Sequence, residues 1–164
     1  MALGPDSQVF ITDSGLGQLF VATPETDFLS PVKLEPEPQQ PTAVLFERET
    51  GYLYIVDTAA HAINVYSGSG ALIRQFGRRG GDMSRPKGVA TDSSGHIYVV
   101  DSMFHAFQIF DSTGELLLIL GSQGHDAGEF WLPTGIFIAP DDSIYVSDSH
   151  NQRVQIFRYI GGKP

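Results

Sequence analysis

Four aspartates recur along the chain at intervals of 44, 44 and 47 residues, namely Asp13, Asp57, Asp101 and Asp148. His61 and His105 each follow one of these aspartates by four residues. Carboxylates and imidazoles are common metal ligands, so a ring of such side chains could hold an ion that activates water for hydrolysis. The residue types therefore raise metal-dependent catalysis as one candidate chemistry.

The surroundings of these residues favour a structural role instead. Each aspartate ends a β-branched, apolar run and precedes a short loop, where a carboxylate accepts backbone N–H groups. His61 and His105 occupy one position of a repeat, which would place them in separate units. We therefore expect these aspartates and histidines to be structural marks of the repeat, and we predict no catalytic residue, metal ligand or cofactor. The other histidines are expected to be solvated, namely His96, His125 and His150.

One basic cluster interrupts an acidic chain whose formal net charge is -9. The candidates for binding an anionic ligand in this cluster are Arg78, Arg79, Arg85 and Lys87, with Arg74 nearby. A patch of this kind could contact RNA through Arg78 and Arg79. The cluster lacks interleaved aromatic residues that stack on bases, so a solvated loop is the favoured interpretation and nucleic acid is an improbable partner.

Phe130 and Trp131 form an aromatic pair within a long polar segment. Because tryptophan is enriched at interaction hot spots, the pair could anchor a partner. Packing between neighbouring structural units is the alternative, and the sequence favours it.

The elements that would position these residues come from an internal repeat. Residues 97–110 match residues 53–66 and 144–157 without a gap, and residues 9–21 form a weaker copy. The period of these copies fits both propeller blades and some helical repeats. The pattern within each unit must therefore decide between the two.

Each unit is predicted to contain four short strands. In the unit that begins near residue 85, these are Gly88–Thr91, Ile97–Asp101, Phe107–Phe110 and Leu116–Leu120, separated by Gly-containing turns. The runs are too short and too rich in β-branched residues for paired helices. Four-stranded units at this period are typical of a β-propeller.

The segment from Asp148 to Phe157 then resembles the motif of the NHL-repeat β-propeller family, in which a strand ends in Asp and is followed by Asn-His-Arg and an apolar strand. Asn151, Gln152 and Arg153 take the Asn-His-Arg positions here. His61 and His105 occupy the histidine position of the other units. The resemblance covers nearly the whole chain and implies a propeller of the bacterial six-bladed type.

The chain is expected to be a partial propeller of about 3.5 to 4 four-stranded blades, resembling the C-terminal part of the family's fold. The predicted blades comprise residues 1–34 (incomplete), 41–77, 86–121 and 133–160 (incomplete). An open arc would expose apolar blade faces. We therefore expect a protein partner or self-association to complete the propeller.

The amino-acid composition and the absence of known catalytic motifs exclude several classes of function. The 164 residues include no Cys, which excludes thiol catalysis and disulfides, and no apolar run long enough to span a membrane. The starts of the inner strands, such as Pro86-Lys87, offer no carboxylate or histidine, and neither GxSxG nor HExxH occurs.

The sequence therefore favours a non-enzymatic scaffold of the NHL β-propeller type that displays rim and face loops to a protein or ligand. Two alternatives stay open. One is a metal-dependent hydrolase or lyase, using Ca²⁺ or Zn²⁺ at a site that other blades complete, and the other is RNA binding. The compartment is unknown, and the resemblance favours an extracytoplasmic one.

Overall fold

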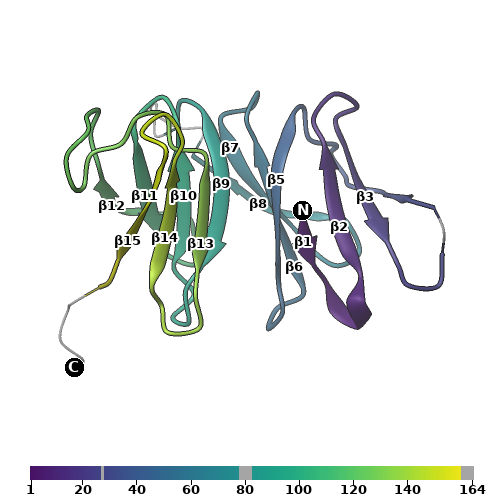
Figure 1. Ribbon diagram of the computed structural model, residues 1–164. Coiled ribbons are helices and arrows are strands. Elements are labelled where there is room, and N and C mark those ends of the chain that lie inside the picture. Colours follow the sequence, from purple (N-terminus) through teal and green to yellow (C-terminus); the bar gives the residue numbers. More distant parts are fainter. Residues whose placement is uncertain (27, 78–82, 160–164) are drawn as a thin grey trace.

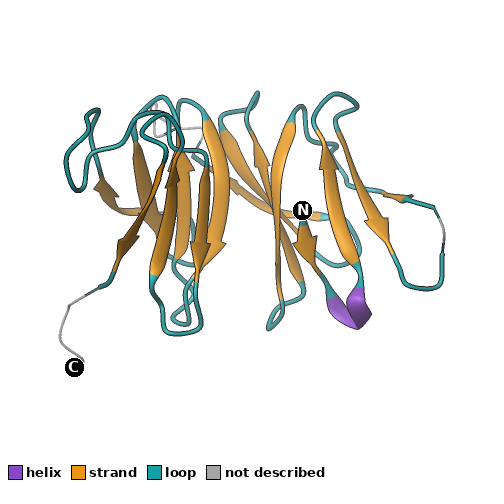
Figure 2. Cartoon of the chain, in the orientation of Figure 1, coloured by secondary structure: helices purple, strands orange, loops and turns teal. Residues whose placement is uncertain are grey.

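A computed structural model describes residues 1–26, 28–77 and 83–159. Its strands form four antiparallel sheets, each built from consecutive strands (Figures 1 and 2). Blade 1 contains β1 (Ala2–Leu3), β2 (Val9–Asp13), β3 (Gln18–Ala22) and β4 (Ser30–Val32). Blade 2 contains β5 (Pro41–Glu47), β6 (Tyr52–Asp57), β7 (Ala62–Tyr66) and β8 (Leu72–Phe76).

Blade 3 contains β9 (Pro86–Thr91), β10 (Ile97–Asp101), β11 (Ala106–Phe110) and β12 (Leu116–Leu120). In the described residues of blade 4 we find β13 (Gly135–Ile138), β14 (Ile144–Asp148) and β15 (Arg153–Phe157). A short 3₁₀ turn, η1 (Pro5–Ser7), joins β1 to β2 and is the purple segment of Figure 2. The structure thus confirms an all-β propeller architecture built from four blades.

The blades stand side by side in chain order, with their inner strands around a shared axis (Figure 1). Successive side chains of a strand point to opposite faces of its sheet. We call the face that packs on the following blade the front face, and the face that packs on the preceding blade the back face. Both faces of an interior blade are covered, which explains why all four residues from Ile97 to Val100 are buried.

Each pair of neighbouring blades encloses an apolar core. Between blades 1 and 2 the main buried residues are Phe10, Leu19, Leu53, Ile55 and Tyr66. Between blades 2 and 3 they include Tyr54, Val56, Ile63, Val65, Ile97, Val99 and Phe110. Between blades 3 and 4 they include Tyr98, Val100, Phe107, Phe130, Ile144 and Val146. The apolar packing that stabilises the chain therefore lies between its blades.

The turn between β7 and β8 depends on Gly70. Its φ of +84° lies in the left-handed region, and a Cβ added there would stand 2.0 Å from the carbonyl oxygen of Lys33. Backbone hydrogen bonds join this turn to the loop before β5: the Glu35 N–H donates to the Gly70 carbonyl, and the Leu72 N–H donates to the Glu35 carbonyl. The loop before β5 is thereby joined to the rim of blade 2.

We expect Gly70→Ala to lower the free energy of unfolding by roughly 2 kcal/mol, from backbone strain and the clash with Lys33. The matched control is Gly95→Ala, because Gly95 has a φ of +81° but nothing within 4 Å of its added Cβ. That control should lose about 1 kcal/mol from the dihedral preference alone. Equal losses in urea denaturation would show that the contact with Lys33 has no energetic weight.

Across the described part of the chain, the structure contains no helix with the length and hydropathy needed to cross a membrane.

Candidate binding site at the loop ends of blades 3 and 4

Each repeat aspartate is the last residue of the second strand of its blade. The Asp57 carboxylate accepts the N–H groups of Gln39 and Gln40 at 2.7 and 3.0 Å, and also that of Ala60. Asp101 likewise accepts N–H groups from Ser84 and Phe104, among others. These carboxylates therefore join the loop before a blade's inner strand to the loop of its central hairpin.

His61 and His105 bridge to the following blade. Nδ1 of His61 lies 2.6 Å from the carbonyl oxygen of Ser84, so it carries a proton and donates. Nδ1 of His105 instead accepts the N–H of Leu132 at 3.1 Å, which requires the other tautomer. Both residues and Gln152 have a φ of +53°, a conformation that histidine tolerates better than most residues. Within the described residues, no three His, Asp or Glu side chains form a group that could hold a metal ion.

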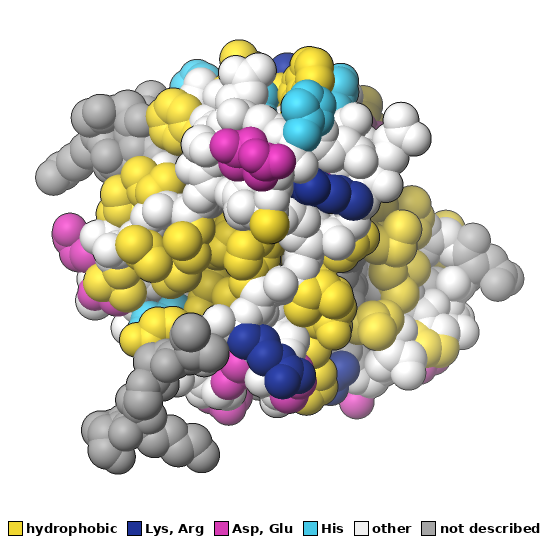
Figure 3. Space-filling model, turned by 60° about the vertical axis from the view of Figure 1, so that its left-hand side comes forward, with side chains coloured by type: hydrophobic (Ala, Val, Ile, Leu, Met, Phe, Trp, Pro, Cys, Tyr) yellow, Lys and Arg dark blue, Asp and Glu magenta, His cyan; other side chains and the backbone are white. Residues whose placement is uncertain are grey.

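Trp131 forms an exposed aromatic platform with His125 and His150. The Trp131 ring centroid lies 5.0 Å from that of His125 in an edge-on arrangement and 6.0 Å from that of His150 in a stacked one. Trp131 is 37% exposed, and both histidines are exposed. Figure 3 shows histidine and hydrophobic side chains together at the upper end of the molecule. We call these three residues the aromatic platform.

A second pair of apolar side chains is exposed on a neighbouring loop. Met103 and Phe104 are exposed on the short loop after β10. The hydrogen bond from Leu132 to His105 brings this loop against the segment that carries Trp131. The neighbouring loops of blades 3 and 4 thus expose the Met103 thioether, the Phe104 ring and the aromatic platform.

Buried polar groups fix the platform in place. The Trp131 N–H donates to the Asp148 carboxylate at 2.7 Å, and the Trp131 carbonyl accepts the N–H of His150. Nδ1 of His125 lies 2.7 Å from Oδ1 of Asn151. Because each platform residue is tied to the loop after β14, the backbone that carries the rings is held in place before any ligand arrives.

Arg153 organises the long loop that precedes Trp131. Its Nε donates to Asp148 at 2.8 Å, and its terminal nitrogens donate to the carbonyls of His125, Asp126 and Glu129. Burial raises the pKa of Asp148, but the hydrogen bonds from Trp131, Asn151 and Arg153 outweigh it and hold this pKa below its ordinary value. Asp148 therefore stays ionised and anchors the loop at neutral pH.

Phe130 and Trp131 are adjacent in sequence but differ in environment. Phe130 is fully buried, and its ring packs against Phe107 and Phe157 at centroid distances of 6.2 and 5.8 Å. A partner that docks on the surface of this chain would touch Trp131 and not Phe130. Phe130 instead anchors the loop before β13 in the core between blades 3 and 4.

The predicted basic cluster is only partly described, because Arg78 and Arg79 lie outside the described residues. Arg85 is exposed, and its N–H donates to Asp101. Lys87 is half-buried on β9, where burial and the nearby Arg85 lower its pKa. Arg74 lies on β8 with its guanidinium 3.4 Å from the Tyr54 hydroxyl. Arg74 therefore points into blade 2, whereas Lys87 faces the axis.

A cavity of about 480 Å³ lies along the axis, between the inner strands β1, β5, β9 and β13. Lys87 is the sole ionisable side chain among the described residues that line it, and most of the others are aliphatic or Phe. Its size falls in the range of ligand pockets, roughly 300 to 1,000 Å³. The lining suits an apolar group or a single anionic one.

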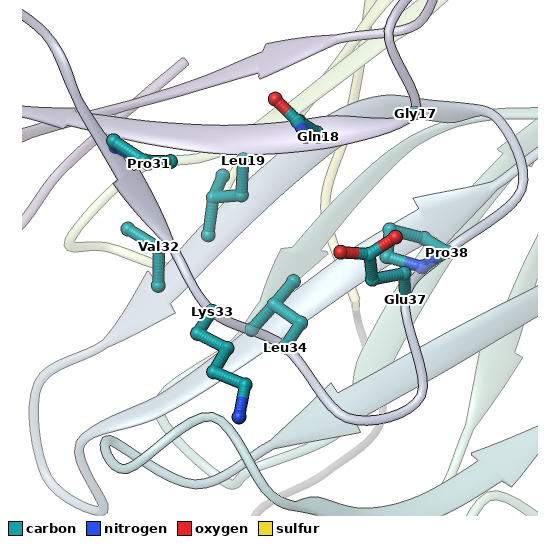
Figure 4. A pocket seen from close by; sticks show the side chains of 9 residues that line it. All are labelled: Gly17, Gln18, Leu19, Pro31, Val32, Lys33, Leu34, Glu37 and Pro38. Atoms are coloured by element: carbon teal, nitrogen blue, oxygen red, sulfur yellow. The ribbon is translucent and has the colours of Figure 1, made fainter.

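A smaller pocket of about 210 Å³ lies at the outer side of blade 1. In Figure 4 the side chains of Leu19, Val32 and Leu34 gather on its wall, while the Lys33 amine points away from them. Lys33 pairs with Glu35 at the surface. This pocket is below the usual size of a site for a small organic ligand.

Sequence reasoning missed four of the residues at this surface. His125 and His150 were expected to be solvated, and they are exposed, but nothing in the sequence placed their rings against Trp131. Phe104 replaces the Asn that precedes the repeat histidine in the motif, which is a signal that could have drawn attention to its loop. The contacts that gather these residues join segments about 20 to 30 positions apart.

Comparison with known proteins supports the same fold. The chain is similar to a streptogramin B lyase structure, with a TM-score of 0.73 and 12% identity over 97% of this chain and 53% of that one. An auxiliary nutrient binding protein from Bacteroides ovatus gives a TM-score of 0.73 and 15% identity over 94% and 46%. Virginiamycin B lyase from Staphylococcus aureus gives 0.69 and 13% over 97% and 54%. The chain thus spans about half the length of these structures, and no curated protein matches it.

At these identities the likeness to solved structures establishes the fold and leaves the activity open. The sequence itself matches the model of the NHL repeat twice, at residues 83–110 and 130–157. The two matches cover β9–β11 and β13–β15, including Asp101 and Asp148 at the ends of β10 and β14. Repeat, register and blade packing agree with these matches, and the chain is a β-propeller that contains two copies of the NHL repeat.

Proposed function

We propose that this chain is a non-enzymatic binding scaffold that presents the aromatic platform to a protein partner. The observation that carries the proposal is the exposed Trp131 ring, which contacts two imidazoles and whose backbone is fixed by a hydrogen bond to buried Asp148. A large ring in a fixed orientation loses little conformational entropy on binding, which is why tryptophan dominates many interfaces.

The surroundings of the platform support a protein as the ligand. Met103 and Phe104 are exposed on the loop that the Leu132–His105 hydrogen bond holds next to the Trp131 segment, and methionine adapts its shape to different partners. Hydrogen-bonding groups of His125, His150 and Asn151 lie around the ring, as in the polar rim of an interface. The rigid blades beneath would hold these loops in a constant relation to one another.

The proposal is tested by affinity capture from an extract of the source cells, with immobilised wild-type protein, Trp131→Ala and a control. Phe28→Ala is the matched control, because Phe28 is an exposed aromatic residue on blade 1, away from the platform. Proteins retained by the wild type and by Phe28→Ala should be lost with Trp131→Ala. The dissociation constant of a purified partner should rise by at least about 30-fold for Trp131→Ala, as expected for a hot spot.

Capture that is unchanged by Trp131→Ala would overturn the platform as the binding surface. Retention of RNA that depends on salt and on Arg78 and Arg79 would favour RNA binding in its place.

A metal-dependent lyase or hydrolase is the second candidate, supported by the similarity of the fold to streptogramin B lyase and virginiamycin B lyase. Its ligand set would come partly from blades outside this chain, around the axial cavity. Purified protein that retains stoichiometric Ca²⁺ or Zn²⁺ and hydrolyses a lactone or ester only when metal is present would establish this candidate.

A further inference from the structure

The blades repeat one packing interface three times along the chain. Tyr54 of blade 2 and Tyr98 of blade 3 occupy one front-face position, and both are buried against the next blade. Leu53 and Ile97 occupy the neighbouring back-face position and are buried against the preceding blade. The front face of each blade therefore packs on the back face of the next blade. The strand register determines which residues are in contact.

The front face of blade 4 has the residues of this interface, but none of the described strands packs on it. Val154 and Ile156 stand where Phe107 and Ile109 of blade 3 are buried. Val154 and Ile156 are each 60% exposed, and Phe137 on the same face is 61% exposed. Together with the half-buried Tyr145 they form an uncovered apolar sheet face.

Blade 1 carries the complementary half. Val9, Ile11 and Ala22 stand where Leu53, Ile55 and Tyr66 of blade 2 are buried, and they are only partly covered. Leu3, the first-blade equivalent of Phe46, is 65% exposed. Among the described blades, blade 4 therefore has an open front face and blade 1 an open back face.

These two faces do not cover each other within one chain, since their side chains remain exposed to solvent. Figure 3 brings the side of the last blades forward and shows hydrophobic side chains gathered across it. In folded β proteins an apolar sheet face of this kind is covered by another element, because exposed apolar patches associate with one another.

We propose that the front face of blade 4 packs on the back face of blade 1 of a second copy of this chain. Each copy carries both halves of an interface that it already makes three times. The chain spans 53% of the streptogramin B lyase structure, so two copies have about the length of one such propeller. Two copies joined head to tail at both ends form a closed ring of eight blades, within the usual range of four to eight.

The repeat identifies residues that meet across the new interface. Phe10 on the front face of blade 1 stacks on Phe46 on the back face of blade 2, with ring centroids 5.7 Å apart. The equivalent of Phe10 on blade 4 is Tyr145, and the equivalent of Phe46 on blade 1 is Leu3. Tyr145 of one copy should therefore contact Leu3 of the other.

The mass of the chain in solution tests the proposal. Light scattering should give about twice the monomer mass of 17.9 kDa for the wild type. Ile156→Glu should raise the dissociation constant of the dimer by at least about 30-fold, because it buries a charge in the interface. Leu117→Glu is the matched control, since Leu117 is an exposed apolar residue on the rim strand β12, and its dimer should be unchanged.

A wild-type monomer at high concentration would overturn the proposal. So would a dimer that survives Ile156→Glu and dissociates with Leu117→Glu, because that result would place the contact on the rim of blade 3. Trp131→Ala should leave the dimer intact, so this test is independent of the proposed partner surface.

Cross-linking provides a second test, which reports directly on the residues that meet across the interface. The chain contains no Cys, so a short bismaleimide can join only cysteines that are introduced. A mixture of Leu3→Cys and Tyr145→Cys protein should give a cross-linked heterodimer, whereas each variant alone should not. Replacing Tyr145→Cys by Leu117→Cys should abolish the product, and equal yields from both mixtures would contradict head-to-tail packing.

Discussion

Phe130→Ala is expected to lower the free energy of unfolding by about 4 kcal/mol, as large-to-small changes of buried phenylalanine do. The ring of Phe130 is fully buried and contacts Phe107 and Phe157, so its removal leaves a cavity between blades 3 and 4. The long loop before β13 would also lose its apolar anchor. Urea denaturation followed by Trp131 fluorescence measures the loss.

The neighbouring residue provides the control. Trp131→Ala should change the free energy of unfolding by about 1 kcal/mol or less, because its ring lies at the surface and its N–H bond to Asp148 does not depend on the side chain. Circular dichroism would follow unfolding of this variant. Similar losses for both variants would show that Trp131 also packs in the core, which would weaken its assignment as a binding residue.

Asp148→Asn is expected to lower the free energy of unfolding by roughly 3 kcal/mol at pH 7. The asparagine can accept only part of the hydrogen bonds from Trp131, Asn151 and Arg153, and it leaves the Arg153 guanidinium without its counter-charge. The aromatic platform should lose its fixed arrangement, so partner binding should weaken along with stability.

The effect has a defined dependence on pH. Because the pKa of Asp148 is lower in the folded chain, its contribution is complete above the ordinary aspartate value of about 3.9 and disappears as the pH falls through the folded-state pKa. The difference between wild type and Asp148→Asn should therefore be constant from pH 5 upward and shrink below about pH 4. Denaturation series at several pH values measure this difference.

Asp141→Asn is the control for this series. Asp141 pairs with Arg158 at the surface, where both side chains are largely exposed. An exposed ion pair contributes little to stability, so Asp141→Asn should leave the unfolding curve nearly unchanged at pH 7. A loss as large as that of Asp148→Asn would mean that total charge, and not the buried anchor, explains the result.

The sequence by itself determined the repeating parts of the molecule. The strands predicted in the third unit agree with β9–β12 to within two residues, and the interval between aspartates gave the blade period. These features can be predicted from the sequence because each strand has its own apolar run and each turn has its own glycine. The NHL resemblance was readable for the same reason, since its motif lies within one hairpin.

The tertiary structure alone decided which residues became surface and which became core. Phe130 and Trp131 differ little in sequence terms, yet one is buried by rings of β11 and β15 and the other is exposed and contacts two histidines. His105 and His61 share one repeat position but adopt opposite tautomers, because one meets an N–H and the other a carbonyl. Strand formation is local, whereas these environments arise from contacts between blades that the repeat pattern does not encode.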